Sequence, residues 1–358
     1  MSDPIRRVAV VGYFASARSA EGDSKDFGGQ TAKCRMLKEW LKSLAGVDYA
    51  EVDTYRWKKN PLRLFSRAIR EARRADVVLM ALSENGLRLI MPLLLRLRNL
   101  FSFRLGYVVI GGWVAKRCEE DSMLLRKLRE LDAIFAETTS MTNDLRALGL
   151  ENVCYVPNAK KLEVLSEPVK VDPSARPLPV CIFSRVCREK GVTTAIEAVA
   201  RVNSERGRPE FFLDIYGPVA DDYREEFGRL LELHSDCVAY KGSVPAGESV
   251  GVLSRYLLLL LLPTRYYGEG FPGTIVDAFS AGLPVVTSDW QNARSIIEDG
   301  ETGFIYGFDD PDGAYATLVK CLDDLNAVSR MRRSCLEESA KYTPDKANKP
   351  IWDFIHKC

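Results

Sequence analysis

The segment from Tyr267 to Val286 reads YGEGFPGTIVDAFSAGLPVV and forms one recognisable structural unit. It follows six consecutive leucines at 257–262, an apolar run typical of a strand buried on both faces. Its glycines and proline predict a turn, and the residues from Gly273 to Ala281 predict a helix. The Gly-Leu-Pro that follows ends this helix before a second strand. Strand, loop, helix and strand in this order are the repeating unit of a parallel sheet with crossover helices.

The same alternation of short apolar runs and longer amphipathic stretches continues along the chain. Further strands are predicted at 8–11, 49–52, 77–82, 107–110, 133–136, 153–156, 180–183, 211–216 and 238–240, and only helices are predicted after the strand at 284–287. Residues 171–179 contain three prolines and no periodicity, which is typical of a linker. The sequence therefore predicts two α/β domains, residues 1–170 and 171–340, facing each other across a cleft at the carboxyl ends of their strands. A helix within 341–358 could cross back to the first domain.

Composition supports two domains and excludes several other classes of protein. A chain of 358 residues exceeds the usual size of a single core, and 46% hydrophobic residues exclude disorder. The nine cysteines form no CxxC pair, which argues against a disulfide scaffold and favours a reducing, cytoplasmic setting. The longest apolar run is too short to span a bilayer. The net charge of +1 combines two opposed halves, because residues 1–170 hold 29 basic and 21 acidic side chains and residues 171–358 hold 21 and 28.

A cationic loop follows the first predicted strand of the second domain. It reads SRVCREKG over residues 184–191, and a helix is predicted directly after it. Between a strand end and a helix N-terminus, Arg185 can offer a bidentate guanidinium and Lys190 a point charge to a diphosphate. The alternative interpretation is a solvated surface loop, and the spacing alone does not separate the two.

Two carboxylates and a group of backbone donors occur within residues 267–286. Glu269 stands at the end of a buried strand, and Asp277 lies eight positions later, about two helical turns further and roughly on the same face. Exposed N–H groups near Phe271 to Thr274 suit a phosphate, and both carboxylates can accept hydrogen bonds from sugar hydroxyls. The alternative interpretation is that these acidic residues only complement a helix dipole. This would explain a single carboxylate, but not the strand, turn, helix and strand pattern of the whole segment.

A third group of residues, Gly28, Gly29 and Gln30, opens the first long helix. Glycines at this place allow close approach of a ligand, and the helix N-terminus offers unpaired N–H groups to an anion. A flexible loop with a glycine cap is the alternative interpretation. The dinucleotide signature GxGxxG and the P-loop signature GxxxxGK[ST] are both absent from the sequence, so neither of these sites is predicted.

These motifs together resemble those of the retaining glycosyltransferases of family 4, in the branch that builds bacterial capsule, O-antigen and exopolysaccharide. Residues 269–286 are similar to the acid-x7-acid motif of that family, and residues 183–195 are similar to its Arg-x4-Lys segment. The resemblance implies the GT-B fold, in which two Rossmann-like domains face each other across a cleft. It also implies retaining transfer of a hexosyl or N-acetylhexosaminyl group from a nucleotide sugar, UDP-linked in the common case, to a glycan or lipid-linked glycan.

The resemblance further implies a role for each residue of the motifs. Arg185 and Lys190 would bind the donor diphosphate, Glu269 would hold hydroxyls of the donor sugar, and Asp277 would accept from the ribose. Other positions would surround the nucleotide sugar, mainly with backbone groups: Gly28, Gly29, Gly217, Gly242, Val244, Gly270, Phe271, Pro272, Gly273 and Thr274. The sequence holds no His/Cys cluster with ligand spacing, and neither a metal ion nor another cofactor is predicted.

A basic stretch from Arg56 to Arg104 holds twelve basic and three acidic residues, interleaved with apolar side chains. Basic and apolar residues on one surface are typical of proteins that lie on an anionic bilayer. We therefore expect peripheral contact with the inner face of the cytoplasmic membrane and a membrane-held acceptor. A core helix with solvated arginines is the alternative. Nucleic acid is not predicted as a partner, because no recognition module accompanies the basic stretch.

Two functions other than glycosyl transfer fit part of this sequence pattern. A GT-B sugar-nucleotide epimerase or phosphorylase would share the fold, but the pairing of Arg-x4-Lys with the acid-x7-acid spacing argues against both. A non-catalytic nucleotide-sugar-binding partner in a polysaccharide assembly complex would share the binding site. The intact Arg185, Lys190 and Glu269 argue against this second alternative.

Overall fold

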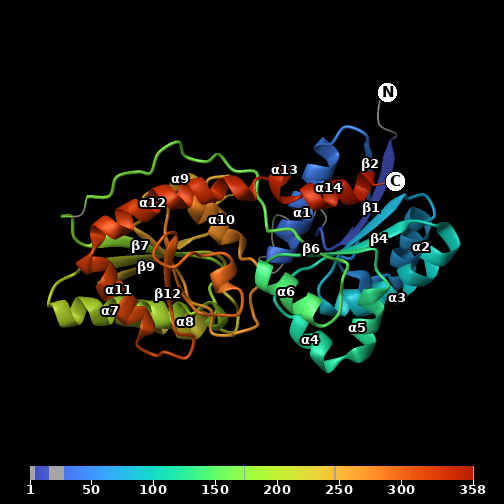
Figure 1. The fold of residues 1–358 in the computed structure, drawn as a ribbon. Helices are drawn as coiled ribbons and strands as arrows, with labels where there is room; N and C mark the ends of the chain where they lie inside the picture. Colours follow the sequence, from blue (N-terminus) through green and yellow to red (C-terminus); the bar gives the residue numbers. More distant parts are fainter. Residues whose placement is uncertain (1–4, 16–27, 173, 246, 358) are drawn as a thin grey trace. The chain divides into compact units, whose positions relative to one another are not determined.

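The computed structural model describes residues 5–15, 28–172, 174–245 and 247–357 (Figure 1). The chain divides into two compact units. Unit 1 comprises Met1–Ala159 and Pro344–Cys358, and unit 2 comprises Lys160–Thr343. The sequence placed these boundaries at 170/171 and 340/341. In the structure the first boundary lies earlier, at 159/160, because the segment after Ala159 is hydrogen-bonded to unit 2. There the Leu165 N–H donates to the Ser280 carbonyl at 3.1 Å.

Unit 1 is built on a six-stranded parallel sheet with the strand order β2-β1-β3-β4-β5-β6. Its strands are β1 (Arg6–Gly12), β2 (Val47–Asp53), β3 (Val77–Ala81), β4 (Arg104–Val108), β5 (Ala133–Ala136) and β6 (Val153–Tyr155). The register places Val8 of β1 opposite Tyr49 of β2 and Val77 of β3. Every residue of β3 is buried, as expected from its unbroken apolar sequence VVLMA in the middle of a parallel sheet.

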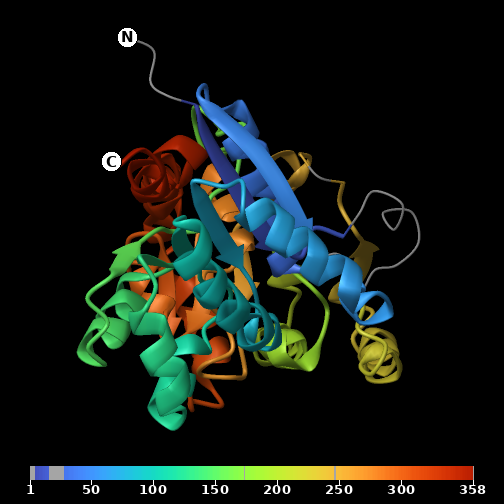
Figure 2. The ribbon, with the colours of Figure 1, turned by 90° about the vertical axis from the view of Figure 1, so that its right-hand side faces the viewer.

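Helices cover both faces of this sheet (Figures 1 and 2). They are α1 (Gly29–Ser43), η3 (Trp57–Lys59), α2 (Pro61–Ala72), α3 (Glu84–Phe101), α4 (Val114–Glu120), α5 (Ser122–Arg129), α6 (Thr139–Ala147), α13 (Pro344–Ala347) and α14 (Lys349–His356). One face packs against α2 to α6 in a core that includes Leu94 and Leu128. The other face packs against α1 and α14 through residues such as Leu37 and Ile355.

The C-terminal helices belong to unit 1, although unit 2 precedes them in the chain. The Trp40 indole N–H donates to Asp345 Oδ1 at 3.0 Å. The Arg104 guanidinium lies 4.7 Å from the centre of the Phe354 ring and donates to the Ile355 carbonyl at 3.1 Å. A hydrogen bond and a cation–π contact therefore attach the end of the chain to the first sheet.

The apolar residues of the basic stretch 56–104 lie mostly in the core of unit 1. Those buried there include Leu64, Ile90, Met91, Leu94, Leu95, Leu97 and Phe103. Leu62 on α2 and Leu100 on α3 are the strongly exposed exceptions, at 80% and 70%. The interleaved pattern that suggested a membrane surface is thus largely the buried face of α2 and α3, which is the core-helix alternative.

Unit 2 is built on a second six-stranded parallel sheet, with the order β12-β11-β10-β7-β8-β9. Its strands are β7 (Leu178–Phe183), β8 (Phe211–Tyr216), β9 (Val238–Gly242), β10 (Leu258–Leu261), β11 (Val285–Ser288) and β12 (Gly303–Tyr306). Counted within the unit, the order is 3-2-1-4-5-6, which is characteristic of Rossmann-like nucleotide-binding sheets. The leucine strand β10 lies inside the sheet and is buried throughout.

The helices of unit 2 again lie on both faces of the sheet. They are η4 (Arg188–Lys190), α7 (Val192–Arg206), α8 (Arg224–Leu233), α9 (Ser249–Leu253), α10 (Gly273–Ser280), η5 (Ala293–Ser295), α11 (Gly313–Asp323), α12 (Leu325–Ser339) and η6 (Ala340–Tyr342). The expectation of helices alone after residue 287 is wrong at β12, which pairs with β11 at the edge of the sheet. This strand reads GFIY, and an apolar run of only four residues cannot be assigned to a strand by periodicity alone.

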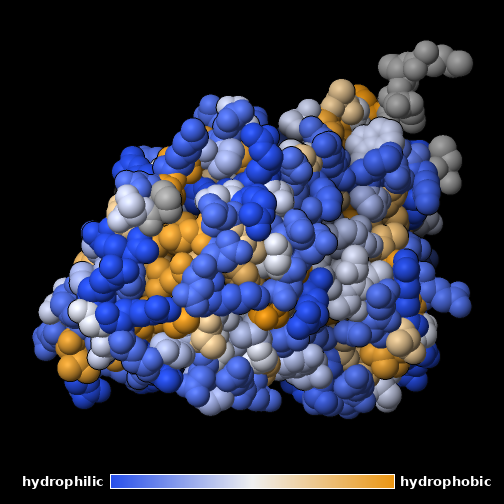
Figure 3. Space-filling view, turned by 60° about the vertical axis from the view of Figure 1, so that its left-hand side comes forward, coloured by the Kyte–Doolittle hydropathy of each residue, from blue (hydrophilic) through white to orange (hydrophobic). Residues whose placement is uncertain are grey.

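The hydropathy of the surface and the state of the cysteines are those usual for a folded protein without disulfides. On the face drawn in Figure 3, hydrophilic residues cover most of the surface and hydrophobic residues appear in smaller areas between them. The eight cysteines that the structure describes all carry free thiols. Two parallel sheets, each covered by helices on both faces, confirm the predicted α/β fold class.

Candidate functional site

The loops after β7 and β10 begin where the connections of the second sheet turn in opposite directions. Ligands of open α/β sheets bind at such a point, outside the carboxyl ends of the strands. The loop after β7 carries Arg185 and Lys190, and the loop after β10 carries Glu269. Because β7 and β10 pair directly, these two loops are neighbours.

Lys190 and Glu269 form an ion pair across these loops. The Lys190 ammonium donates to Glu269 Oε1 at 2.7 Å, and the side chains are 19% and 18% exposed. Both charged groups therefore stay within reach of a ligand while each neutralises the other. The Asn292 amide, on a residue with no exposed surface, donates to the Glu269 carbonyl at 2.8 Å and holds the backbone of that loop. Sequence analysis missed Asn292, because no spacing rule connects it to Glu269.

Gly191 explains how Lys190 is held at this place. Its φ is +71°, and a Cβ on it would lie 1.9 Å from the carbonyl oxygen of Leu262, just after β10. Only glycine tolerates both the left-handed conformation and this close approach. The turn after η4 therefore rests directly on the end of β10, which places Lys190 beside the loop of Glu269.

Arg185 and Cys187 complete the cationic loop. Arg185 is exposed, and its guanidinium makes no hydrogen bond or ion pair with the residues that the structure describes. Burial raises the pKa of the Cys187 thiol, so this cysteine stays protonated at neutral pH and adds no negative charge. The loop thus presents two paired cations, Lys190 with Glu269 and Arg188 with Glu226, and one cation open to solvent, Arg185.

Gly217 and Gly242 lie beside the same loop at the ends of β8 and β9. Gly217 has a φ of +129°, and a Cβ there would lie 1.9 Å from the Ser184 carbonyl oxygen. The Gly217 N–H donates to the Gly242 carbonyl at 2.9 Å. The structure therefore brings both predicted glycines next to the cationic loop, and Val244 follows as a partly exposed residue.

The segment 270–274 forms the start of α10. Gly270, Phe271 and Pro272 are buried, and Pro272 is the N-cap, so no side chain caps the helix. The first N–H groups of α10, on Gly273 and Thr274, therefore have no partner within the helix. The Thr274 hydroxyl is buried and finds no hydrogen-bond partner among the described residues. These donors fit the predicted binding of an anion by the helix N-terminus.

Asp277 is more enclosed than the sequence suggested. The residue is 2% exposed, Oδ1 accepts from the Ser249 hydroxyl at 2.8 Å, and Oδ2 accepts from the Lys160 ammonium. Sequence analysis missed both partners, because Lys160 lies before the linker and Ser249 on a separate helix. A carboxylate has about four acceptor positions, so Asp277 keeps capacity for a ribose hydroxyl, and that role stays a prediction.

Gly28 and Gly29 belong to unit 1. Gly28 is the N-cap of α1, and Gly29 is its first residue. A Cβ on either glycine would meet no heavy atom of the described residues within 4 Å. Their predicted contact with the donor phosphates stays a prediction.

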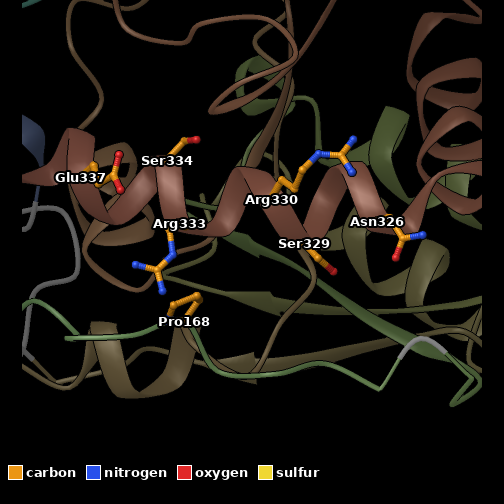
Figure 4. A pocket seen from close by; sticks show the side chains of 7 residues that line it. All are labelled: Pro168, Asn326, Ser329, Arg330, Arg333, Ser334 and Glu337. Atoms are coloured by element: carbon orange, nitrogen blue, oxygen red, sulfur yellow. The ribbon is translucent and has the colours of Figure 1, made fainter.

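A separate pocket of about 640 Å³ in unit 2 does not involve the predicted residues. It is lined mainly by α12, including Arg330, Arg333 and Glu337 (Figure 4). Figure 4 shows that the side chains of Arg330 and Arg333 point away from each other, so they do not form a common anion site. Arg333 instead lies 3.7 Å from Glu167.

The described part of the chain holds neither a cluster of metal ligands nor a helix that could span a membrane. Residues 5–15, 28–172, 174–245 and 247–357 contain no group of three or more His, Cys, Asp or Glu side chains placed to hold a metal ion. Within the same residues, every helix is too short or too polar to cross a membrane.

Comparisons with known proteins agree with this geometry. Residues 178–324 match the model of the family described as glycosyl transferases group 1. The poly(glycerol-phosphate) alpha-glucosyltransferase of Bacillus subtilis (strain 168) is 22% identical over 61% of this chain and 31% of its own length. The amylovoran biosynthesis glycosyltransferase AmsK of Erwinia amylovora is 28% identical over 40% of this chain and 36% of its own length. The chain thus spans about a third of the length of the curated relatives it matches.

Solved structures resemble the chain over nearly its whole length. Anabaena Alr3699/HepE, in complex with UDP and glucose, has a TM-score of 0.72 at 15% identity and covers 98% of this chain and 99% of its own. Sucrose-phosphate synthase from Thermosynechococcus elongatus has a TM-score of 0.72 at 14% identity, with 98% of both chains covered. The chain therefore has the GT-B fold, and its residues 178–324 form a glycosyl transferases group 1 domain.

Proposed function

We propose that the chain is a glycosyltransferase that moves a hexosyl or N-acetylhexosaminyl group from a nucleotide sugar to a glycan or lipid-linked glycan. The observation that carries the proposal is the Lys190–Glu269 pair, at 2.7 Å, beside the uncapped N-terminus of α10 and within the group 1 domain. A cation, a carboxylate and free backbone donors meet there at the ligand-binding edge of the sheet.

Glycosyl transfer from a nucleotide sugar requires groups of these kinds. Departure of a nucleoside diphosphate develops negative charge, and preorganised cations and N–H groups stabilise it. Lys190 and the α10 N-terminus lie at the site, and the exposed Arg185 can add a bidentate contact to the phosphates. When Lys190 binds the diphosphate, Glu269 is left free to accept from the sugar hydroxyls. We propose on this basis that these groups bind the donor without a metal ion or other cofactor.

UDP is the nucleotide we propose for the donor. The support is that the similar Anabaena structure holds UDP and glucose. We further propose retention of configuration, as in the family 4 enzymes that the motifs resemble. A surface-polysaccharide acceptor is supported by the amylovoran biosynthesis glycosyltransferase among the relatives. A cytoplasmic location at the inner face of the membrane is part of the proposal, and the exposed Leu62 on α2 and Leu100 on α3 are available for such contact.

The test measures nucleoside diphosphate release from a panel of UDP-, GDP- and ADP-sugars in the presence of glycan acceptors, with the anomer of the product assigned by NMR. Glu269→Gln and Lys190→Met should each lower kcat by about 10²–10³-fold, the usual cost of losing one charge-stabilising group. Glu205→Gln is the matched control, because this carboxylate also pairs with a cation but on the exposed side of α7.

The results separate the candidate functions. UDP release that depends on Glu269 and Lys190 supports transfer. Tight UDP-sugar binding without release or transfer would instead favour a non-catalytic binding partner. Full activity in Glu269→Gln, with the fold intact by circular dichroism, would overturn the assignment of this site.

A further inference from the structure

Lys160 lies beside the site of unit 2, although it stands outside the motifs and outside the residues 178–324 that match the family model. Its ammonium donates to Asp277 Oδ2 and makes no other hydrogen bond or ion pair with the residues that the structure describes. The two side chains differ in accessibility, because that of Lys160 is 31% exposed and that of Asp277 is 3% exposed. A ligand that approaches the pair therefore meets the ammonium, whereas the carboxylate is almost fully covered.

The backbone of Lys160 is fixed beside α10. Its N–H donates to the Tyr342 carbonyl at 3.2 Å. The buried Tyr342 ring has its centre 5.1 Å from that of Phe271, just before α10, and 6.3 Å from that of Phe279, near the end of the helix. The place of Lys160 is therefore set by the packing of Tyr342 against this segment as well as by the ion pair.

The carboxylate of Asp277 is held from a second helix. Its Oδ1 accepts from the hydroxyl of Ser249, the first residue of α9, at 2.8 Å. Both α9 and α12 lie against α10 (Figure 1). Arg332 of α12 is 3% exposed and donates to the carbonyl of Ser254, at the end of α9, at 3.1 Å. Each oxygen of Asp277 thus has a donor, and both donors come from anchored segments.

The Lys160–Asp277 pair lies one helical turn beyond the expected phosphate site. Asp277 follows Gly273, whose N–H has no partner within the helix, by four residues, which is about 6 Å along the axis and on the same face. A nucleoside diphosphate carries its ribose directly next to its phosphates. A nucleotide bound at the start of α10 would therefore bring its ribose to this pair. An ammonium has three N–H donors and Asp277 uses one of them, so two remain for ribose oxygens.

We infer that Lys160 binds the ribose of the donor nucleotide and selects ribonucleotides over deoxyribonucleotides, while Asp277 and Ser249 hold its ammonium in place. The location of the nucleotide at α10 rests on the proposed function. In place of the ribose contact that the resemblance implies for Asp277, the buried carboxylate acts through Lys160, and the ribose hydroxyl oxygens accept from the ammonium. Lys160 is thus a binding residue, and Asp277 is a positioning residue.

Binding of ribonucleotides and deoxyribonucleotides tests the inference. Calorimetry on the full chain compares UDP, GDP and ADP and then, for each that binds, its 2′-deoxy and 3′-deoxy forms. We expect the wild type to bind at least one deoxy form about tenfold more weakly, the usual effect of losing one hydrogen bond to a charged group. Lys160→Met should weaken the ribonucleotide about tenfold and leave that deoxy form unchanged, so that the ratio of the two affinities falls to about one.

Two further variants separate ribose binding from a purely structural role. Lys161→Met is the matched control and should keep the wild-type ratio, because Lys161 is the exposed neighbour and forms no ion pair with the described residues. Lys160→Gln can still donate to Asp277, and it serves as the second variant in case Lys160→Met does not fold; it should also lower the ratio. Since both ligands are measured on the same protein, a loss of stability alone leaves their ratio unchanged.

The outcomes distinguish this inference from the proposed function. Equal affinity of the wild type for the ribonucleotide and both deoxy forms overturns the inference. A wild-type ratio retained in Lys160→Met and Lys160→Gln also overturns it, and would return the ribose contact to Asp277. Either result, with nucleoside diphosphate release intact, leaves the proposed transfer standing. A chain that binds none of the three nucleotides would overturn both.

Discussion

The buried ion pair between Lys33 and Glu137 offers a sharp test of how unit 1 is held together. The side chains are 4% and 5% exposed, the ammonium donates to the carboxylate, and it also donates to the Val109 carbonyl at 3.1 Å. The pair joins α1 to the segment after β5, on the side of the sheet where α1 begins. Removal of Lys33 would leave the Glu137 carboxylate buried without this cation.

The expected magnitude follows from this burial. Loss of one member of a buried pair costs about 3–5 kcal/mol, so Lys33→Met should lower the free energy of unfolding by that amount. For a unit of roughly 150–250 residues each kcal/mol lowers Tm by about 2–4 °C, which gives a shift of about 6–20 °C. Differential scanning calorimetry, with tryptophan fluorescence in urea as a second probe, would measure it.

Two further variants make the reasoning refutable. Lys116→Met is the matched control, because Lys116 is 45% exposed and lies 3.5 Å from Glu119, and such exposed pairs contribute at most about 1 kcal/mol. Lys33→Met/Glu137→Gln removes both charges and should recover part of the loss. A Lys33→Met protein as stable as Lys116→Met, or a double variant less stable than Lys33→Met, would show that the pair does not act as argued.

Three more outcomes follow from the structure of unit 2. Gly191→Ala should lower the free energy of unfolding by about 3 kcal/mol or more and weaken UDP binding, because its Cβ would overlap a carbonyl after β10; equal stability in urea would contradict this. Lys160→Met should cost about 1–3 kcal/mol by leaving the buried Asp277 without its cation, and Lys161→Met should cost little in the same assay. Burial raises the pKa of Glu210, but hydrogen bonds from two arginine side chains outweigh it and leave that pKa below its usual value near 4.5. The stabilisation from Glu210 is therefore complete above about pH 4.5 and lost as the pH falls further, so acid should destabilise wild type more than Glu210→Gln in urea titrations.

Local sequence order was enough to predict most of the repeating strand and helix units. Short apolar runs and their glycine and proline boundaries predicted most strands, because a strand buried on both faces has to be apolar along its length. The same order placed Arg185, Lys190 and Glu269 at strand ends. It did not reveal β12, because its apolar run GFIY is too short for periodicity alone to identify a strand. It also assigned to a membrane surface leucines that are core residues of α2 and α3.

The partners of these residues came only from the tertiary structure. Lys190 and Glu269 are far apart in the sequence and meet because β7 and β10 are adjacent in the sheet. Lys160 at Asp277, and Lys33 at Glu137, likewise depend on which segments become neighbours. Sequence determined which residues stand at the ends of strands, since periodicity and turn chemistry are local. Strand order decided which of them meet, because it arises from the packing of the whole sheet and not from any one segment.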